Sequence, residues 1–337
     1  MTPNPPSPPK RVRAIGLLSG GLDSLLAARV VQEQGIEVMA LSFESPFFTA
    51  ARARVAAAAA GVPLRIVDFT PDILGIVDHP RHGFGQGLNP CIDCHARMLQ
   101  RADEIRRAEG FDFIFTGEVL NQRPMSQTNR TLKIVAKEGG VEEVLVRPLS
   151  AQVLPETEVE RRGLIDRSRL LGIQGRSRRG HRAVAARFGI TALPNVTGGC
   201  CLAEPNFANR LRELRKHGGA RDLDAIRLLF HGRHFRLTEE IKLVVGRDQE
   251  DNAGIEKLNP RGYLWLHATE GNGPTCLLTA TANDGEIALA ASICAHYVKA
   301  SAHGPIRVTV RLPDGSRHEE RTTGPVDPAL FKAMRIL

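Results

Sequence analysis

The sequence predicts a doubly wound α/β fold, in which helices cover both faces of a parallel, Rossmann-like sheet, followed by a smaller α+β domain. Short apolar runs alternate with stretches of helical spacing over the first part of the chain. The first run ends in a glycine-rich turn that opens a helix, and beyond residue 220 the pattern becomes rich in strands. Buried strands that alternate with helices are typical of a parallel sheet. The change of pattern indicates a second domain.

Five short apolar runs are expected to form the strands of the parallel sheet. They cover residues 13–18, 38–43, 64–69, 113–116 and 144–146. Helical spacing follows the first run over residues 23–34, and an alanine-rich helical segment over residues 49–60 separates the second run from the third. Residues 72–90 carry several Gly and Pro residues and predict a long irregular loop, a kind of segment that often carries function.

A domain boundary is expected near residue 220. Residues 206–216 have the pattern of a charged helix, and a Gly218-Gly219 break follows them. The expected domains are therefore a proline-rich tail over residues 1–10, an α/β domain over 11–220 and an α+β domain over 221–337. In the last domain the pattern predicts strands at 243–247, 263–267, 285–293 and 306–311, with one helical stretch around 288–300.

Composition and charge narrow the class of protein. The 337 residues carry a formal net charge of +8, and 42% of them are hydrophobic. No window approaches the roughly 18 apolar residues of a membrane span, and the first ten residues lack the apolar core of a secretory signal. We therefore expect a cytoplasmic protein with no membrane partner. The positive charge favours a polyanion such as nucleic acid, although many soluble proteins are basic for solubility alone.

The loop Ser19-Gly-Gly-Leu-Asp-Ser24 is the strongest functional signal in the chain. It follows an apolar strand and opens a helix, so its glycines let the backbone approach an anion while hydroxyls, N–H groups and the helix dipole attract it. The loop lacks the lysine of a Walker A loop and the third glycine of a dinucleotide fingerprint. This argues against ordinary kinases, GTPases and dehydrogenases.

A second signal comes from cysteines. Cys91 and Cys94 are three residues apart at the expected start of a helix, and Cys200 and Cys201 follow a Gly198-Gly199 turn far along the chain. A pair at a helix start favours thiolates, and three convergent thiolates can hold a [4Fe–4S] cluster with one iron open. Zinc, with His95 or Cys201 as a fourth ligand, and a redox thiol pair are the alternatives. For Cys276 and Cys294, free buried thiols are expected.

The loop resembles that of the PP-loop ATP pyrophosphatase superfamily, which is adenine nucleotide alpha hydrolase-like in fold. The segments Thr116–Gln127, Arg147–Leu149 and Pro194–Cys200 resemble its thiouridine-forming branch, which includes tRNA 4-thiouridine synthetases and 2-thiouridylases. Residues 241–252 resemble an NFACT-R type RNA-binding domain. No THUMP-type domain precedes the loop in this chain, so RNA capture is expected to be organised differently.

The resemblance implies ATP-dependent thiolation of tRNA, in which a uridine carbonyl oxygen is adenylylated and sulfur then displaces AMP. It implies that ATP, with Mg²⁺, is held by loop residues and by residues at neighbouring strand ends, namely Ser19, Gly20, Gly21, Asp23, Ser24, Phe43, Gly117 and Arg147. Phe43 is expected to contact adenine or, with even odds, to be a core residue. Arg123 and Arg147 are expected to neutralise charge on the phosphates, with a surface ion pair as the alternative for Arg147 and with Lys133 as a weaker candidate.

Asp23, Cys94 and Cys200 are the expected catalytic residues, and Cys91, Cys94 and Cys200 the expected cluster ligands. Sulfur is expected to arrive as sulfide on the open iron or as a persulfide, with a cysteine desulfurase as one source, and a homodimer is a further expectation. The basic run at residues 176–187 and the C-terminal domain are expected to bind tRNA through its phosphates. Two alternatives stay open: a PP-loop enzyme that transfers sulfur to, or amidates, a small molecule, and a non-catalytic RNA-binding protein.

Overall fold

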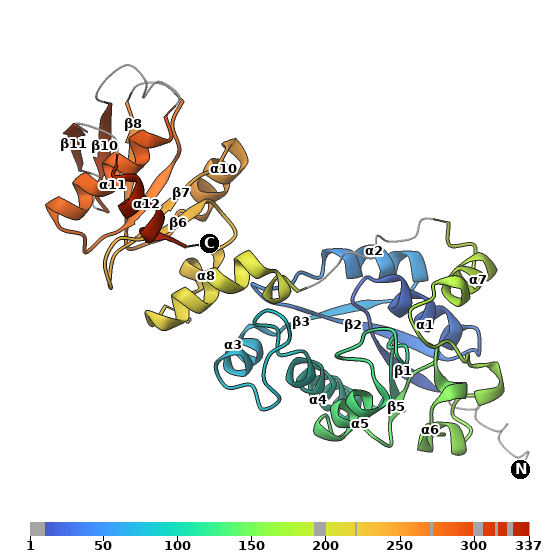
Figure 1. Cartoon of the computed structure of the whole chain (residues 1–337). Coiled ribbons are helices and arrows are strands. Elements are labelled where there is room, and N and C mark those ends of the chain that lie inside the picture. The colour runs from blue at the N-terminus through green and yellow to red at the C-terminus, as the bar shows by residue number, and fades with distance from the viewer. Residues whose placement is uncertain are drawn as a thin grey trace, which may run out of the picture. The chain divides into compact units, whose positions relative to one another are not determined.

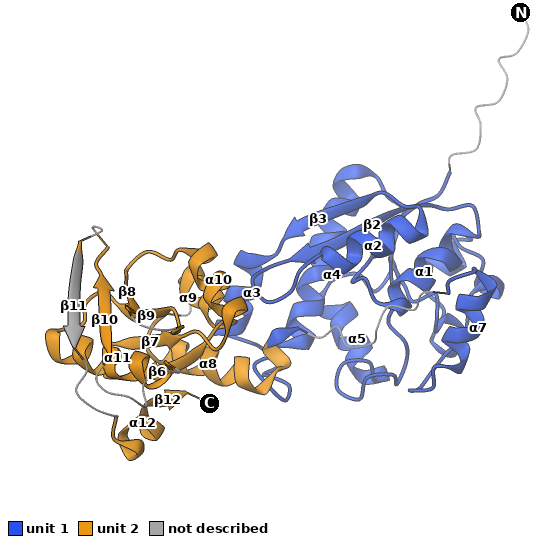
Figure 2. Cartoon of the chain, turned by 90° about the horizontal axis from the view of Figure 1, so that it is seen from above, with its two compact units in different colours: residues 1–201 blue, residues 202–337 orange. Residues whose placement is uncertain are grey.

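The chain folds into two compact units, residues 1–201 and residues 202–337 (Figure 2). The structure is a computed structural model, and it describes residues 11–191, 200–219, 221–269, 272–298, 306–313, 316–321 and 326–336. The expected tail at residues 1–10 lies outside these ranges. No helix in the described ranges is both long enough and apolar enough to cross a bilayer.

The first unit is built on a five-stranded parallel sheet in the order β3-β2-β1-β4-β5. Its strands are β1 (Arg13–Leu17), β2 (Glu37–Glu44), β3 (Leu64–Asp68), β4 (Phe113–Thr116) and β5 (Leu145–Val146). All five lie where the apolar runs predicted them, and the doubly wound fold class is confirmed. The order reverses between β1 and β4, and in open α/β sheets ligands bind at the carboxyl ends of the strands at such a point.

Helices cover both faces of this sheet (Figure 1). In chain order they are α1 (Leu22–Gln32), α2 (Ala51–Ala60), α3 (Thr70–Asp78), α4 (Cys91–Glu109), α5 (Asn129–Glu138), the short turns η1 (Ala151–Val153), α6 (Glu158–Arg161) and η2 (Arg167–Arg169), and α7 (Arg179–Arg187). Helix α1 packs with α2 and α7, whereas α4 packs with α3 and α5. The core between α1 and the sheet is built from side chains such as Leu26, Phe113 and Phe115, all nearly inaccessible to solvent.

The second unit contains a seven-stranded antiparallel sheet in the order β11-β10-β8-β9-β7-β6-β12. Its strands are β6 (Arg233–Arg236), β7 (Lys242–Val245), β8 (Tyr263–Ala268), β9 (Cys276–Thr279), β10 (Arg307–Arg311), β11 (Arg317–Arg321) and β12 (Arg335–Ile336). Its helices are η3 (Cys201–Ala203), which begins at the unit boundary, α8 (Pro205–Lys216), α9 (Leu223–Leu228), α10 (Gln249–Leu258), α11 (Asp284–His296) and α12 (Pro328–Met334). The predicted α+β class of this unit is confirmed.

Two sequence expectations for the second unit need correction. Residues 285–293 were expected as a strand, but they form α11, because Asn283 and Glu286 close a capping box that starts a helix. The chain divides after Cys201 and not near residue 220, because α8 belongs to the second unit. Glu213 on α8 forms ion pairs with Arg236 on β6 at 2.5 Å and with Lys242 on β7 at 2.8 Å.

Candidate active site

The glycine-rich loop connects β1 to α1 at the point where the strand order reverses. Gly20 has φ of +80°, and a Cβ at this position would lie 2.4 Å from the backbone of Arg52, so only glycine fits. The Gly21 N–H donates to Ser19 Oγ at 3.4 Å, and Ser24 Oγ donates to the Gly21 carbonyl at 2.9 Å. The loop thus places an exposed serine and the N-terminus of an 11-residue helix at the ligand-binding edge of the sheet.

Asp23, in the first turn of α1, is held by three side chains from distant parts of the chain. Gln122 Nε2 and Arg178 Nη1 each donate to its carboxylate at 2.6 Å, and His181 Nε2 lies 3.2 Å away. Burial by itself would raise the pKa of Asp23, but the contacts with His181, Gln122 and Arg178 outweigh burial and lower it. Asp23 is therefore a carboxylate at neutral pH, and its charge is already compensated by the protein.

Gly117 and Glu118 follow β4 and connect the loop to a buried ion pair. A Cβ on Gly117 would lie 2.5 Å from the backbone nitrogen of Ser24, so this segment packs directly on the start of α1. Glu118 Oε2 accepts from Arg147 Nε at 2.9 Å and from Thr116 Oγ1 at 3.0 Å. Burial opposes ionisation of Glu118, yet the nearby Arg147 and His95 lower its pKa to about 2.

Arg147 is therefore engaged inside the protein. Besides Glu118, its guanidinium donates to the Leu132 carbonyl at 3.1 Å, and only 11% of its side chain is exposed. From the sequence, a surface ion pair was one expectation for Arg147, and the structure shows that its ion pair with Glu118 is buried. The geometry makes Arg147 a support for Glu118.

The cysteines of the two motifs come together near the start of α4. Cys91 is the first residue of this helix, and Cys94 follows within the first turn. Burial, then the neighbouring Cys200 and Cys91, raise the pKa of the Cys94 thiol well above its usual range. Burial and the two neighbouring thiols thus disfavour the thiolate form of Cys94, and the thiolate expected at this helix start stays a prediction.

The described residues contain no group of three or more His, Cys, Asp or Glu side chains arranged to hold a metal ion. The Gly198-Gly199 turn before Cys200, like the rest of the motif segment at residues 194–199, lies outside the described ranges. The chemistry of the donor set nevertheless suits iron or zinc, since Cys91 and Cys200 are near enough to Cys94 to contribute to the raised pKa of its thiol. His95 Nδ1, adjacent to Cys94, lies 3.6 Å from Glu118 Oε1 and connects this helix to the buried ion pair.

Phe43 is a core residue. It lies at the end of β2, is 6% exposed and packs edge-on against Phe69 with ring centroids 5.3 Å apart. The structure favours this alternative over a side-chain contact with adenine. Lys133 on α5 and Arg123 are exposed.

The basic run at residues 176–187 is only partly a solvated face. Arg178 pairs with Asp23, Arg187 pairs with Glu33, and His181 is fully buried. Arg178, His181 and Gln122 are thus site residues that the sequence reasoning did not assign to ATP. The available signal was the i, i+3, i+4 spacing of His181, Val184 and Ala185, which predicts one buried face of a helix and places His181 on it.

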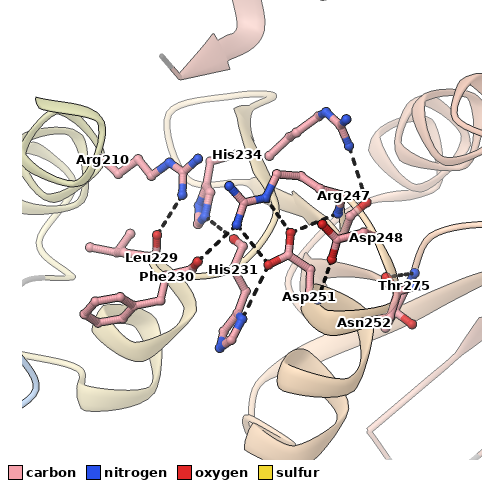
Figure 3. A network of polar contacts seen from close by, with 12 residues as sticks. Arg210, Leu229, Phe230, His231, His234, Arg247, Asp248, Asp251, Asn252 and Thr275 are labelled. Atoms are coloured by element: carbon pink, nitrogen blue, oxygen red, sulfur yellow. Dashed lines mark hydrogen bonds and ion pairs between the residues drawn. The ribbon is translucent and has the colours of Figure 1, made fainter. Parts of the chain in front are cut away.

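The second unit uses several of its cations internally (Figure 3). Arg247 donates to both carboxylate oxygens of Asp251 at 2.5 and 3.0 Å, and His231 lies 3.6 Å from the same carboxylate. Arg210 on α8 donates to the Leu229 carbonyl at 2.7 Å. Burial opposes ionisation of Asp251, but the Arg247 contacts lower its pKa. Arg247 thus connects the segment after β7 to α10, and Arg210 connects α8 to the residues after α9.

Other cations of this unit lie over aromatic rings. The Arg311 guanidinium is 5.0 Å from the Trp265 ring centroid, and that of Arg233 is 4.5 Å from the Tyr297 ring. Arg311 is exposed, and Trp265 is stacked 6.4 Å from His267. An exposed guanidinium held over an aromatic ring is suited to contact phosphate or a base.

Comparison with known proteins gives a match for each unit. Residues 11–153 match the family described as thiamine biosynthesis protein (ThiI), and residues 232–333 match the NFACT protein RNA binding domain. The resemblances stated from the sequence are therefore confirmed for these ranges.

Curated relatives match part of the chain. A "probable tRNA sulfurtransferase" of Anoxybacillus flavithermus is 32% identical over 132 residues, which are 36% of this chain and 32% of the relative. A "tRNA sulfurtransferase" of Desulfurococcus amylolyticus is 30% identical over 176 residues, 50% of this chain and 34% of the relative. The chain spans about a third of the length of these relatives. A crystal structure of a 4-thiouridine synthetase–RNA complex with bound ATP aligns with 20% identity and a TM-score of 0.39, over 64% of this chain and 52% of that one.

Proposed function

We propose that this chain, which carries a ThiI-type domain over residues 11–153 and an NFACT-type RNA-binding domain over residues 232–333, is an ATP-dependent tRNA sulfurtransferase. The observation that carries the proposal is the loop Ser19–Ser24 at the reversal of strand order, with Cys91 and Cys94 at the start of a helix of the same unit. An anion loop and a thiol cluster in one unit suit a reaction that uses ATP to activate a carbonyl and sulfur to replace its oxygen.

The proposed reaction has two steps. The uridine carbonyl oxygen attacks the α-phosphorus of ATP, so that an oxygen–phosphorus bond forms and pyrophosphate leaves. Sulfide then attacks the activated ring carbon, a carbon–sulfur bond forms, and AMP leaves with the original oxygen. The sum converts uridine, ATP and sulfide into thiouridine, AMP and pyrophosphate without a net oxidant or reductant. Either 4-thiouridine or 2-thiouridine satisfies this chemistry.

ATP, which enters as its Mg²⁺ complex, would be held at the strand ends. Ser19, Gly20, Gly21 and Ser24 offer hydroxyl and backbone N–H donors to the phosphates at the start of α1. Gly117 allows the segment after β4 to approach this loop. Arg147 acts indirectly in this proposal, because it holds Glu118 beside Gly117.

Cys91, Cys94 and Cys200 would hold a [4Fe–4S] cluster, and Cys94 and Cys200 are the thiols closest to the sulfur chemistry. When bound, such a cluster supplies one iron with an open position for sulfide. Because the pKa of Cys94 is raised in the metal-free protein, metal binding must displace a proton from this thiol. Zinc and a persulfide relay are the competing uses of the same residues. The persulfide route would need a donor such as a cysteine desulfurase and a reductant to resolve the resulting disulfide.

The second unit would bind tRNA mainly through phosphates. The support is its match to an RNA-binding domain, the exposed Arg311 over Trp265, and the net charge of +8. Binding that depends on phosphate contacts weakens steeply as salt rises, because condensed counterions no longer gain entropy on release. We therefore expect tRNA affinity to fall by at least about tenfold between 50 and 200 mM salt, measured by filter binding.

The decisive experiment uses the full chain, purified anaerobically, with unmodified tRNA, ATP, Mg²⁺ and sulfide. Nucleoside mass spectrometry should detect thiouridine, and AMP and pyrophosphate should appear in equal amounts. Omission of ATP should abolish all three. Pyrophosphate exchange with ATP in the absence of any thionucleoside would count against tRNA as the substrate and favour a small-molecule substrate.

The sulfur site needs its own test. Reconstitution with iron and sulfide should give a brown protein with about four irons per chain, and Cys94→Ser should lose the iron together with thiouridine formation. The same variant should keep tRNA-dependent pyrophosphate exchange, because adenylylation precedes sulfur attack. A colourless, iron-free protein that is active with a persulfide donor would exclude the cluster.

A further inference from the structure

The charge of Asp23 poses a physical problem at an ATP loop. A carboxylate in the first turn of α1 repels phosphate unless a cation lies between them or beside them. Mg²⁺ is one solution. The protein, however, contains a cation of its own at this position, because Arg178 lies 2.6 Å from Asp23 Oδ1.

Much of the acceptor capacity of the Asp23 carboxylate is already used inside the protein, because Oδ1 faces Arg178 and His181 and Oδ2 accepts from Gln122. Arg178 is in the opposite situation. Among the described residues only Asp23 contacts its guanidinium, through Nη1, so Nε and Nη2 can donate elsewhere. Its side chain is 29% exposed and can reach a ligand.

The position of Arg178 is fixed by backbone contacts to the site. Just upstream, Gln174 forms a parallel bridge with Leu120, and the Gly175 N–H donates to the Leu120 carbonyl at 2.7 Å. Leu120 belongs to the segment that follows β4 and also carries Gln122. Behind Arg178, the ring of His181 is fully buried against Asp23. The segment is thus attached to the loop that borders the ligand edge.

We propose that Arg178 binds the β- and γ-phosphates of ATP, and that Asp23 is a positioning residue that holds the Arg178 guanidinium. This inference rests on the proposed function, since it presumes ATP as the ligand. When the bond between the α-phosphorus and the bridging oxygen breaks, negative charge accumulates on the departing pyrophosphate. The free donors of Arg178 stabilise that charge, and the uridine oxygen forms the new bond on the opposite side of the phosphorus.

Calorimetric binding of ATP and of AMP to the full chain tests the role of Arg178 without tRNA or sulfur. Arg178→Met should weaken ATP binding by about 10- to 100-fold while AMP affinity changes by less than about threefold, because AMP has no β- or γ-phosphate. Arg178→Lys should lie in between, since it keeps the charge and loses the fork. Arg162→Met, an exposed arginine of the same unit, is the matched control and should change neither affinity.

Asp23→Asn separates the positioning role from a metal-ligand role. We expect it to weaken ATP binding by about tenfold both in Mg²⁺ and in EDTA, and the double variant with Arg178→Met should be no weaker than Arg178→Met alone. A loss confined to Mg²⁺ would make Asp23 a metal ligand and overturn the inference. Equal losses for ATP and AMP in Arg178→Met would also overturn it. If the unmodified protein binds no ATP at all, the proposed function itself fails.

Discussion

Two carboxylates lie at the glycine-rich loop, Asp23 within it and Glu118 beside Gly117, and they differ in what surrounds them. Asp23 is 19% exposed, and its partner Arg178 lies 155 positions away in the sequence. Glu118 is 10% exposed and is enclosed by Arg147, His95 and Thr116. Both have lowered pKa values, but the Arg178 side chain beside Asp23 is 29% exposed, whereas the Arg147 side chain beside Glu118 is 11% exposed and also donates to the Leu132 carbonyl. The difference teaches that a lowered carboxyl pKa alone does not define a role: Glu118 is a buried structural support, whereas a ligand role for Asp23 and Arg178 rests on the proposal above.

The largest effect on the free energy of unfolding is expected for a substitution of Glu118, and it tests the contrast between Glu118 and Asp23. Glu118→Gln leaves the Arg147 guanidinium buried without its counter-charge, and we expect a loss of about 3 to 5 kcal/mol in the free energy of unfolding. Urea denaturation measures it, with the exposed Glu142→Gln as the matched control. A loss below about 1 kcal/mol would mean that Glu118 is no structural support.

The pH dependence of the free energy of unfolding should also show the contribution of the Glu118 carboxylate. The pKa of Glu118 falls from an ordinary 4.5 to about 2 in the folded protein. Its contribution is therefore fully present above about pH 4.5 and is lost as the pH falls toward about 2, up to about 3 kcal/mol. Other carboxylates titrate in this range, so the informative quantity is the difference between the unmodified protein and Glu118→Gln. Parallel stability curves for the two proteins from pH 5 to 2.5 would contradict the assignment.

Asp23→Asn should change stability much less than Glu118→Gln. Arg178 is 29% exposed, so water can solvate its guanidinium when the carboxylate charge is removed. We expect a loss of about 1 kcal/mol or less, measured in the same urea titration. A loss as large as that of Glu118→Gln would erase the contrast between the two carboxylates.

The smallest effect is expected at His95, the residue beside Cys94. Its Nδ1 lies 3.6 Å from Glu118, a weak contact, and 34% of its side chain is exposed. His95→Asn should cost about 0.5 kcal/mol of stability. Thermal unfolding of the two proteins, compared at pH 6 and pH 8, measures it; a cost of several kcal/mol would place His95 among the main supports of Glu118.

The parallel sheet could be predicted from the sequence because each strand is a local apolar run. The β1 and β4 runs are buried on both faces and therefore look continuous rather than alternating. Residues 285–293 were misassigned for the same reason: an apolar helix such as α11 has no polar face, and its signal is the Asn283 cap instead. The boundary after Cys201 could not be predicted, because the ion pairs of Glu213 that attach α8 to the second unit are formed only on folding.

Like the fold, the candidate site has one part that could be predicted from the sequence and another part that could not. The loop Ser19–Ser24 is contiguous, so its place between β1 and α1 could be predicted from the sequence. The contacts of Asp23 with Gln122, Arg178 and His181 join segments that the chain separates by 99 residues or more. Charge density made residues 176–187 look like a tRNA surface, yet burial shows which of these cations turn inward. Distinguishing Arg178 from its basic neighbours requires the fold.

Because Arg178 lies far after Asp23 in the sequence, the ribosome adds it to the chain much later. The ribosome has made all five strands of the first sheet by residue 146, but Arg178 and His181 do not yet exist. A nascent or truncated chain that ends at residue 153, where the ThiI match ends, would therefore present Asp23 without its neutralising cation. If Arg178 binds ATP as proposed above, such a chain has the complete sheet but lacks a residue that binds the phosphates. The ability to bind ATP is then acquired late in synthesis.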